Sequence, residues 1–328
     1  MQKDPDYYIR GVLDANRLML SRTITLIESA LPAHQELAGR IIEQLLPHTG
    51  NAVRLGITGV PGAGKSTFIE SFGTLLTELG HRVAVLAIDP SSSRSGGSVL
   101  GDKTRMLELS VNDSAFIRPS PSGGTLGGVA RKTRESMLAC EAAGFDVIIV
   151  ETVGVGQSET AVASMVDFFL VLMIAGAGDE LQGIKKGILE VADSIVINKA
   201  DGDNLVRAER ARREYETALH ILTPASSNWS PRVMTCSALH KTGLGEIWEL
   251  VNDHRTALTT SGELQARRRK QALDWMYFLL EEGLKNWFYH HPDIETTLPA
   301  LTAAIERQTL SPTAAAGQLL SILKKQEG

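Results

Sequence analysis

The sequence predicts an α/β fold in which helices cover both faces of a mostly parallel, doubly wound sheet, with helical extensions at both ends. From residue 52 onward, short apolar runs alternate with stretches of helical periodicity, a pattern typical of parallel sheets. The chain has 328 residues, of which 43% are apolar, enough for one large core. The predicted strands are Val53–Thr58, Val83–Ile88, Val147–Glu151, Phe168–Ile174, Ser194–Asn198 and Arg232–Thr235.

Residues 1–50 are predicted to form an N-terminal helical extension. Apolar side chains recur near helical spacing between Tyr7 and Leu46. Pro32 interrupts this pattern, so we expect one helical run before it and a second helix from about His34.

Residues 261–328 are predicted to form a C-terminal helical arm, which leaves residues 51–260 for the central domain. A helix begins near Arg267, and two shorter helices after Leu298 are split near Pro312. One face of the first helix carries Leu273, Tyr277, Leu280, Leu284 and Trp287. Taken alone, such an apolar stripe is more often intramolecular core than an interface between chains.

Composition and charge narrow the class of partner. The chain has 33 Lys and Arg against 38 Asp and Glu, a net charge of −5, which gives no reason to expect nucleic acid or a membrane surface as a partner. The two cysteines, Cys140 and Cys236, are far apart and indicate neither a disulfide framework nor a zinc site. The polar N-terminus is no signal peptide, and the apolar stretch 168–178 is too short to span a bilayer. We expect a cytoplasmic protein.

The clearest motif follows the first predicted strand and matches the pattern G-x-x-x-x-G-K-[ST] at every fixed position. It consists of Gly59, Val60, Pro61, Gly62, Ala63, Gly64, Lys65 and Ser66, and Thr67 continues into a helix. Glycines let main-chain N–H groups approach phosphate oxygens closely. Lys65 is expected to reach the β and γ phosphates, and the Ser66 hydroxyl to bind Mg²⁺. The sequence therefore predicts a P-loop NTPase fold.

A second motif, Asn198-Lys199-Ala200-Asp201, ends a later strand at the edge where such sheets bind ligands. The Asp201 carboxylate can accept two hydrogen bonds from guanine, which adenine does not offer in that arrangement. Lys199 can cover the purine face, and Asn198 can brace the loop. A further loop resembles the one that contacts the guanine carbonyl in GTPases, and it contains Ser237, Ala238 and Leu239. The expected nucleotide ligands are GTP and GDP.

Acidic residues at strand ends are candidates for the metal site. Glu151 ends a strand and is followed by Gly154, whose amide is expected to face the γ-phosphate. Asp89 ends another strand, and Asp102 lies in a Ser- and Gly-rich stretch. The candidate catalytic residues are Lys65, Asp89, Asp102, Glu151 and Gly154, and the candidate Mg²⁺ ligands are Ser66, Asp89, Asp102 and Glu151.

With these motifs in order, the chain resembles the MeaB/ArgK family, GTPases associated with methylmalonyl-CoA mutase. The resemblance rests on the motifs above and on the segments 88–92, 101–103, 151–157 and 176–187. It implies a GTPase chaperone that assists an adenosylcobalamin-dependent methylmalonyl-CoA mutase in cofactor loading and protection. It also implies that the C-terminal arm forms a homodimer and that a switch loop containing Asp179, Gln182 and Lys185 senses the mutase.

Three other function classes stay open. The resemblance also implies a phosphotransferase as an alternative, because some members of the family are described as kinases linked to the transport of basic amino acids. An acceptor-side base has no fixed motif, and the protein-kinase motifs H-R-D and D-F-G are absent. A metal-delivery GTPase as a rule needs a Cys/His capture site, whereas the eight histidines here are scattered. A structural nucleotide-binding module would show no turnover. Val155 stands where many small GTPases have glutamine, and Gln157 comes later, so we expect slow hydrolysis without a partner.

Overall fold

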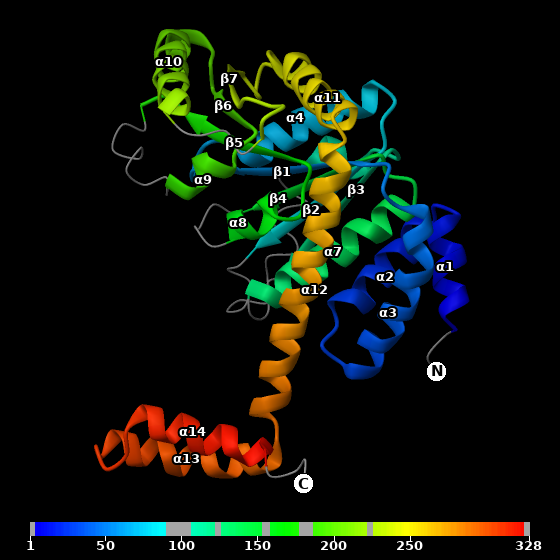
Figure 1. Cartoon of the computed structure of the whole chain (residues 1–328). Coiled ribbons are helices and arrows are strands. Elements are labelled where there is room, and N and C mark those ends of the chain that lie inside the picture. The colour runs from blue at the N-terminus through cyan, green and yellow to red at the C-terminus, as the bar shows by residue number, and fades with distance from the viewer. Residues whose placement is uncertain are drawn as a thin grey trace. The chain divides into compact units, whose positions relative to one another are not determined.

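The computed structural model describes residues 4–89, 106–121, 126–152, 158–176, 186–221 and 226–324, and the side chains of a few residues beside the gaps lie outside this description. The chain forms two compact units, which divide between Arg268 and Arg269. The first contains the sheet, the helices around it and the N-terminal helices, and the second contains C-terminal helices (Figure 1).

The sheet has seven strands in the described part of the chain, in the order β3-β2-β4-β1-β5-β6-β7, and every neighbouring pair is parallel. The strands are β1 (Val53–Gly59), β2 (Val83–Asp89), β3 (Ala115–Pro121), β4 (Val147–Thr152), β5 (Phe168–Ile174), β6 (Ser194–Asn198) and β7 (Arg232–Thr235). The predicted α/β class with a doubly wound parallel sheet is confirmed, as are all six predicted strands. The strand β3, which lies at one edge of the sheet beside β2, was not predicted from the sequence.

One face of the sheet is covered by α4 (Lys65–Glu78), α6 (Leu107–Val111) and α11 (Leu244–Thr260). These helices pack against alternate strand residues such as Leu55 and Ile57, which are fully buried. Phe68 and Phe72 of α4 stack with ring centroids 5.4 Å apart, and Trp248 of α11 lies edge-on to Phe72. The helix that follows the first strand is therefore fixed by a continuous aromatic and aliphatic core.

The other face is covered by α7 (Leu126–Ala142), α8 (Ser158–Ala163) and α10 (Leu205–Ile221), with α9 (Lys186–Val191) beside α8 and the 3-10 turn η3 (Gly202–Asn204) before α10. Gly56 of β1 shows how closely α8 approaches: a Cβ there would lie 2.9 Å from a methyl group of Val162. With helices on both faces, the strands are buried on both sides and read as continuous apolar runs.

The N-terminal helices α1 (Pro5–Leu13), α2 (Arg17–Glu28) and α3 (Pro32–Leu45), with the 3-10 turn η1 (Leu46–His48), pack beside α7 (Figure 1). The expectation of one helical run before Pro32 was wrong. The chain turns between α1 and α2, where Ala15 has a φ of 56°, and the Asn16 carboxamide oxygen accepts hydrogen bonds from the N–H groups of Leu18 and Met19. Asn16 therefore starts a new helix as an N-cap.

Ion pairs secure the amino edge of the sheet to the first residues of α12 (Glu263–Tyr289). Arg268 binds the Asp167 carboxylate with a shortest distance of 2.5 Å and donates to the main-chain oxygen of Ala52 at 2.7 Å. Asp167 also accepts from the main-chain N–H of Arg54. The Arg54 side chain in turn binds buried Glu141 of α7 at 2.6 Å. The buried carboxylates of Asp167 and Glu141 are therefore each paired with an arginine, which offsets the free-energy cost of removing these charges from water.

The second unit contains the rest of α12 followed by α13 (Pro292–Glu306) and α14 (Pro312–Lys324), which pack on each other. Ile294, Ala315 and Leu319 are buried in this unit. The predicted split near Pro312 is confirmed. The stripe from Leu273 to Trp287 is not covered: each of its five members is more than half exposed.

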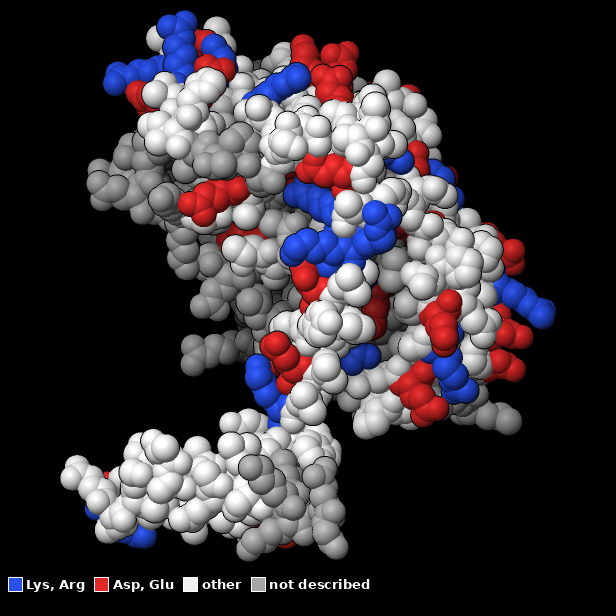
Figure 2. All heavy atoms as spheres, viewed as in Figure 1, with Lys and Arg blue, Asp and Glu red and all other residues white. Residues whose placement is uncertain are grey.

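Figure 2 shows basic and acidic side chains interspersed over the visible face of the first unit, while the visible face of α13 and α14 carries few charges. Among the described residues, no helix is both long and apolar enough to cross a membrane.

Candidate functional site

The phosphate-binding loop joins the carboxyl end of β1 to the start of α4, as the sequence predicted. Gly62 and Gly64 have φ angles of 78° and 86°, a region that favours glycine. Gly59 is required for a different reason, because a Cβ there would lie 2.2 Å from the main-chain oxygen of Leu172 on β5. The loop is therefore seated tightly on the neighbouring strand, with the N-terminus of α4 directly after it.

Lys65 is the first residue of α4, and its side chain reaches back to the loop that precedes the helix. Its ammonium group donates to the main-chain oxygens of Gly59 at 2.7 Å and Val60 at 3.3 Å. Burial lowers the pKa of Lys65, and the carboxylates of Glu151 and Glu159 oppose that shift. A partly buried ammonium held by loop carbonyls and facing two acids is a cation that can turn to an incoming phosphate.

The second motif ends β6 beside the phosphate-binding loop. The Asn198 side-chain amide donates to the main-chain oxygen of Ala63 at 2.8 Å. Its oxygen accepts from the main-chain N–H of Ala238 at 3.0 Å and from the Cys236 thiol at 3.4 Å. One buried side chain therefore connects the phosphate-binding loop, the end of β6 and the loop after β7.

Asp201 and Lys199, predicted to contact the purine, lie in the loop that follows β6. The Ser237 hydroxyl donates to the Asp201 carboxylate, and His240 N–H donates to the same hydroxyl at 3.2 Å. Lys199 has a φ of 60°, and the Asn204 side chain donates to its main-chain oxygen at 2.7 Å. A Cβ on Gly64 would lie 3.9 Å from the Lys199 side chain, so the lysine stem extends toward the phosphate-binding loop.

The acid on β4 also lies at this edge. Glu151 is buried and sits opposite Ile57 of β1, two residues before Gly59. The next residue, Thr152, donates its hydroxyl hydrogen to the Thr58 hydroxyl at 2.7 Å, which joins the carboxyl ends of β4 and β1. The Glu151 carboxylate and the Ser66 hydroxyl provide oxygen atoms of the kind that Mg²⁺ prefers as ligands, so the chemistry of these two groups fits the predicted ion.

The match to a family model decides the family. Residues 20–293 match the model described as methylmalonyl Co-A mutase-associated GTPase MeaB. The chain belongs to the MeaB family.

Similar proteins match almost the whole of this chain. GTPase ArgK of Escherichia coli is 52% identical over 318 residues, covering 97% of this chain and 96% of that protein. The mouse protein named methylmalonic aciduria type A homolog, mitochondrial, is 47% identical over 333 residues, covering 98% of this chain and 80% of its own. A crystal structure titled LAO/AO transport system kinase is 45% identical, with a TM-score of 0.80 and 99% of each chain covered. The P-loop α/β fold is thus shared with a solved structure.

Several predicted residues of this MeaB-family chain fall outside the described residues. Asp102, Gly154, Asp179, Gln182 and Lys185 are among them, and so is Gln157. Asp89 ends β2, at the same sheet edge as Glu151, but its side chain is outside the description. Their predicted roles stay predictions.

The structure adds two residues that the sequence analysis did not single out. Glu159, in the first turn of α8, is 2% exposed and close enough to Lys65 to act on its charge. An acid just after the glycine-rich stretch that follows β4 was the available signal. Ser71 of α4 donates its hydroxyl hydrogen to the main-chain oxygen of Ala238 at 2.7 Å, a second link from the phosphate-binding helix to the loop after β7.

Proposed function

We propose that this MeaB-family chain binds GTP with Mg²⁺ and hydrolyses it to GDP and phosphate. The observation that carries the proposal is the hydrogen bond from Asn198 to Ala63. This bond fixes the distance between the loop expected to bind phosphate and the loop expected to recognise guanine. A nucleoside triphosphate could contact both loops at once, whereas a free phosphate compound could contact only the first, so this link supports a nucleotide as the ligand.

Each site residue then has a defined task. Lys65 exchanges its bonds to loop carbonyls for bonds to the β and γ phosphates, and the N–H groups at the start of α4 add positive potential. Asp201 accepts hydrogen bonds from the guanine N1–H and 2-amino groups. Ser66 and Glu151, with Asp89 and Asp102, would hold Mg²⁺, which when bound neutralises phosphate charge. The negative charge of Glu159 favours the protonated form of Lys65.

Labelled nucleotides test this proposal against phosphotransfer. The chain is incubated separately with γ-³²P-GTP and γ-³²P-ATP in the presence of Mg²⁺. Free phosphate released from GTP and not from ATP supports hydrolysis of GTP. Label retained on protein would instead support the kinase alternative, for which the name of the 45%-identical transport system kinase is the reason. Tight binding of GTP without turnover, even with a partner present, would leave only a structural nucleotide-binding module.

We further propose that hydrolysis serves an adenosylcobalamin-dependent methylmalonyl-CoA mutase, whose cofactor loading and protection the chain regulates as a chaperone. The family description and the name of the mouse relative support this partner. In this proposal residues 1–50 are an N-terminal extension, residues 51–260 the GTPase domain and residues 261–328 a homodimerisation arm, in a cytoplasmic protein. Asp179, Gln182 and Lys185 form the switch that senses the mutase.

Partner-stimulated turnover tests the mutase proposal. GTP hydrolysis is measured with and without a purified adenosylcobalamin-dependent methylmalonyl-CoA mutase. We expect slow basal turnover that the mutase accelerates. Asp179→Ala and Lys185→Ala should retain basal turnover and lose most of the acceleration. Equal loss of basal and stimulated rates in both variants, or no acceleration of the unaltered chain, would contradict the switch.

A further inference from the structure

Among the described residues, the last strand of the sheet, β7, has a neighbouring strand on one side only, where it pairs with β6. Cys236 N–H donates to the Ile197 oxygen, and in a parallel ladder alternate residues bond the same neighbour. The main-chain N–H and C=O groups of Arg232 and Met234 therefore point toward β6, whereas those of Val233 and Thr235 point to the open side of β7. No described residue bonds the Val233 N–H or oxygen.

The open edge is short. A Cβ on Gly243 would lie 2.6 Å from the Thr235 oxygen, so the backbone of the following loop covers that group. Val233 is left with one donor and one acceptor. These two groups can add a short segment of extended chain, but they cannot support a long strand.

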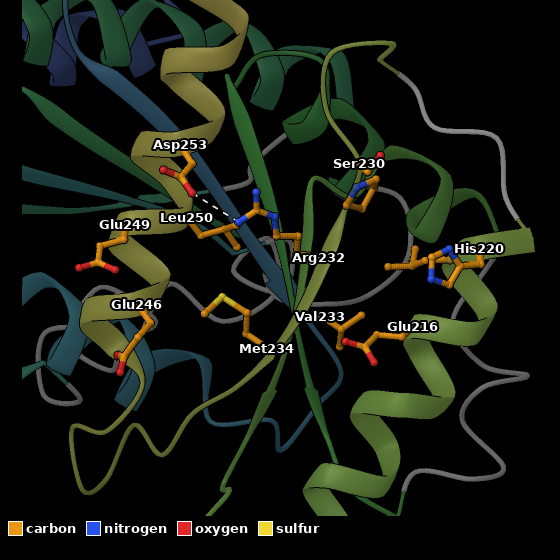
Figure 3. A pocket seen from close by; sticks show the side chains of 12 residues that line it. Glu216, His220, Ser230, Arg232, Val233, Met234, Glu246, Glu249, Leu250 and Asp253 are labelled. Carbon is orange, nitrogen blue, oxygen red and sulfur yellow. Dashed lines mark hydrogen bonds and ion pairs between the residues drawn. The ribbon is translucent and has the colours of Figure 1, made fainter.

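A cavity of about 570 Å³ lies along this edge, between α10 and α11. Figure 3 shows Glu246, Glu249 and Asp253 of α11 on one side of β7, and Glu216 and His220 of α10 on the other. The cavity is outside the nucleotide site, because none of its lining residues belongs to the loops described above.

The walls of this cavity carry uncompensated negative charge. Arg232 is paired with Asp253 at 3.4 Å, and Glu216 is paired with Arg212 of α10. Glu246 and Glu249 are both exposed, and within the described residues no Lys, Arg or His lies within ion-pair distance of either. They are three positions apart on α11, so both carboxylates face the same side of the helix.

We propose that this edge binds an extended segment of a partner protein with Lys or Arg at alternate positions, which adds to the sheet beside β7. Alternate side chains of an extended chain point to the same face, so its basic residues would meet Glu246 and Glu249 together. The two main-chain bonds of Val233 set the register, and the carboxylates select the sequence. Because the ladder is short and the acids are exposed, the interaction is weak and salt-dependent.

A fluorescent hexapeptide probes the edge on the full-length chain. The basic probe is Lys-Thr-Lys-Val-Lys-Thr with blocked ends, and its matched counterpart carries Glu in place of every Lys. We expect the basic probe to bind at least tenfold more tightly by fluorescence anisotropy, with affinity falling as salt rises. Equal binding of the two peptides, or no binding of the basic one at low salt, would overturn the proposal.

Matched variants locate the contact. Glu246→Gln combined with Glu249→Gln should weaken the basic peptide about tenfold and leave GTP hydrolysis unchanged, which also shows that the variant is folded. The control, Glu36→Gln combined with Glu43→Gln on α3, removes the same charge from exposed positions and should bind the peptide normally. Equal weakening in both variants would mean that net charge, and not this edge, attracts the peptide.

Strand addition is tested apart from charge. Two variants of the basic peptide carry methyl groups on main-chain nitrogens, one at the first, third and fifth residues and the other at the second, fourth and sixth. Both variants keep all lysines, but each lacks the main-chain N–H donors of one edge of the extended peptide. At least one should bind tenfold more weakly, and the unmodified peptide should slow hydrogen exchange at Val233. Unchanged binding of both methylated peptides would show that the peptide binds only through electrostatic attraction to Glu246 and Glu249, and not by adding a strand to the sheet. Dimers of the chain that dissociate on Glu246→Gln and Glu249→Gln would assign the edge to a second copy instead.

Discussion

The side-chain amide of Asn198 donates a hydrogen bond to the main-chain oxygen of Ala63, 2.8 Å away, across 135 residues of sequence. Through its oxygen the same side chain also binds Ala238 N–H. The loop predicted to bind phosphate and the loop after β7 are thereby linked through one buried side chain. Such a link reduces the number of arrangements that the two loops can adopt relative to each other.

Asn198→Ala should weaken both nucleotide binding and folding. The substitution leaves the Ala63 oxygen and the Ala238 N–H buried without a partner, at a cost of about 1–3 kcal/mol. We expect a lower midpoint of thermal unfolding and at least a tenfold weaker affinity for both GTP and GDP by calorimetry. Asn252→Ala, on the exposed surface of α11, is the control and should change neither. Loss of GTP affinity with unchanged GDP affinity would contradict a role of Asn198 in linking the two loops.

Lys65→Ala should abolish GTP hydrolysis and reduce triphosphate binding. The ammonium is the cation held inside the phosphate loop, and an alanine there leaves the β and γ phosphates without it. Phosphate release and calorimetry measure the two effects. Lys285→Ala, on the exposed surface of α12, removes the same charge and should behave as the unaltered chain. Normal turnover in Lys65→Ala would refute the assignment of the loop.

Asp201→Asn should shift nucleotide preference from GTP toward xanthosine triphosphate. The amide cannot accept from the guanine 2-amino group as the carboxylate does, and each hydrogen bond to a charged group contributes about 1.5–3 kcal/mol. We expect GTP affinity to fall about a hundredfold, while xanthosine triphosphate binds more tightly than before. Competition of both nucleotides against a fluorescent GDP analogue gives the ratio. An unchanged ratio would remove Asp201 from the base pocket.

Leu280→Lys should convert a dimer of the chain into monomers. Leu280 lies in the middle of the exposed apolar stripe on α12, and a charge there opposes burial against a second copy. Sedimentation equilibrium of the unaltered chain and the variant reports the masses. Asn286→Lys places the same charge on a different face of this helix and should leave the dimer intact. If the unaltered chain is monomeric at high concentration, the arm is not a dimerisation element.

The two thiols should resist alkylation until the chain unfolds. Burial raises the pKa of Cys236 to about 12 and raises that of Cys140 as well, so neither is a thiolate at pH 8. Mass spectrometry after iodoacetamide should show no modification of the native chain and two adducts in denaturant. Because the Cys236 thiol donates to the Asn198 oxygen, Asn198→Ala should raise the reactivity of Cys236 and leave that of Cys140 unchanged. Rapid labelling of the native chain would contradict the burial.

The sequence predicted the central strands and the nucleotide loops because both depend on local patterns. The strand β3 was missed because Arg118, Pro119 and Pro121 break its apolar run, which an edge strand with one neighbour tolerates. The turn between α1 and α2 was missed because the apolar residues on both sides of it resemble one pattern near helical spacing, although Leu13 and Leu18 are five positions apart. Asn16, a residue type that favours the N-cap position, could have indicated that a new helix starts there.

What the sequence could not supply is the partner of each side chain. The second motif identified Asn198 as a loop brace, but no spacing rule reveals that its amide meets Ala63. The nearness of Glu159 to Lys65 depends in the same way on how α8 packs against β1, which is set by the absence of a side chain at Gly56. Residue types follow from local patterns, whereas these distances follow from packing.

The exposed apolar stripe on α12 carries a spectroscopic reporter of its own. Trp287 is 58% exposed, whereas Trp229 and Trp248 in the first unit are each 7% exposed. An indole in water emits at longer wavelength than one in an apolar interior, so Trp287 contributes the red side of the emission band. If a second copy of the chain covers the stripe, dilution should therefore shift the emission to longer wavelength without any added dye.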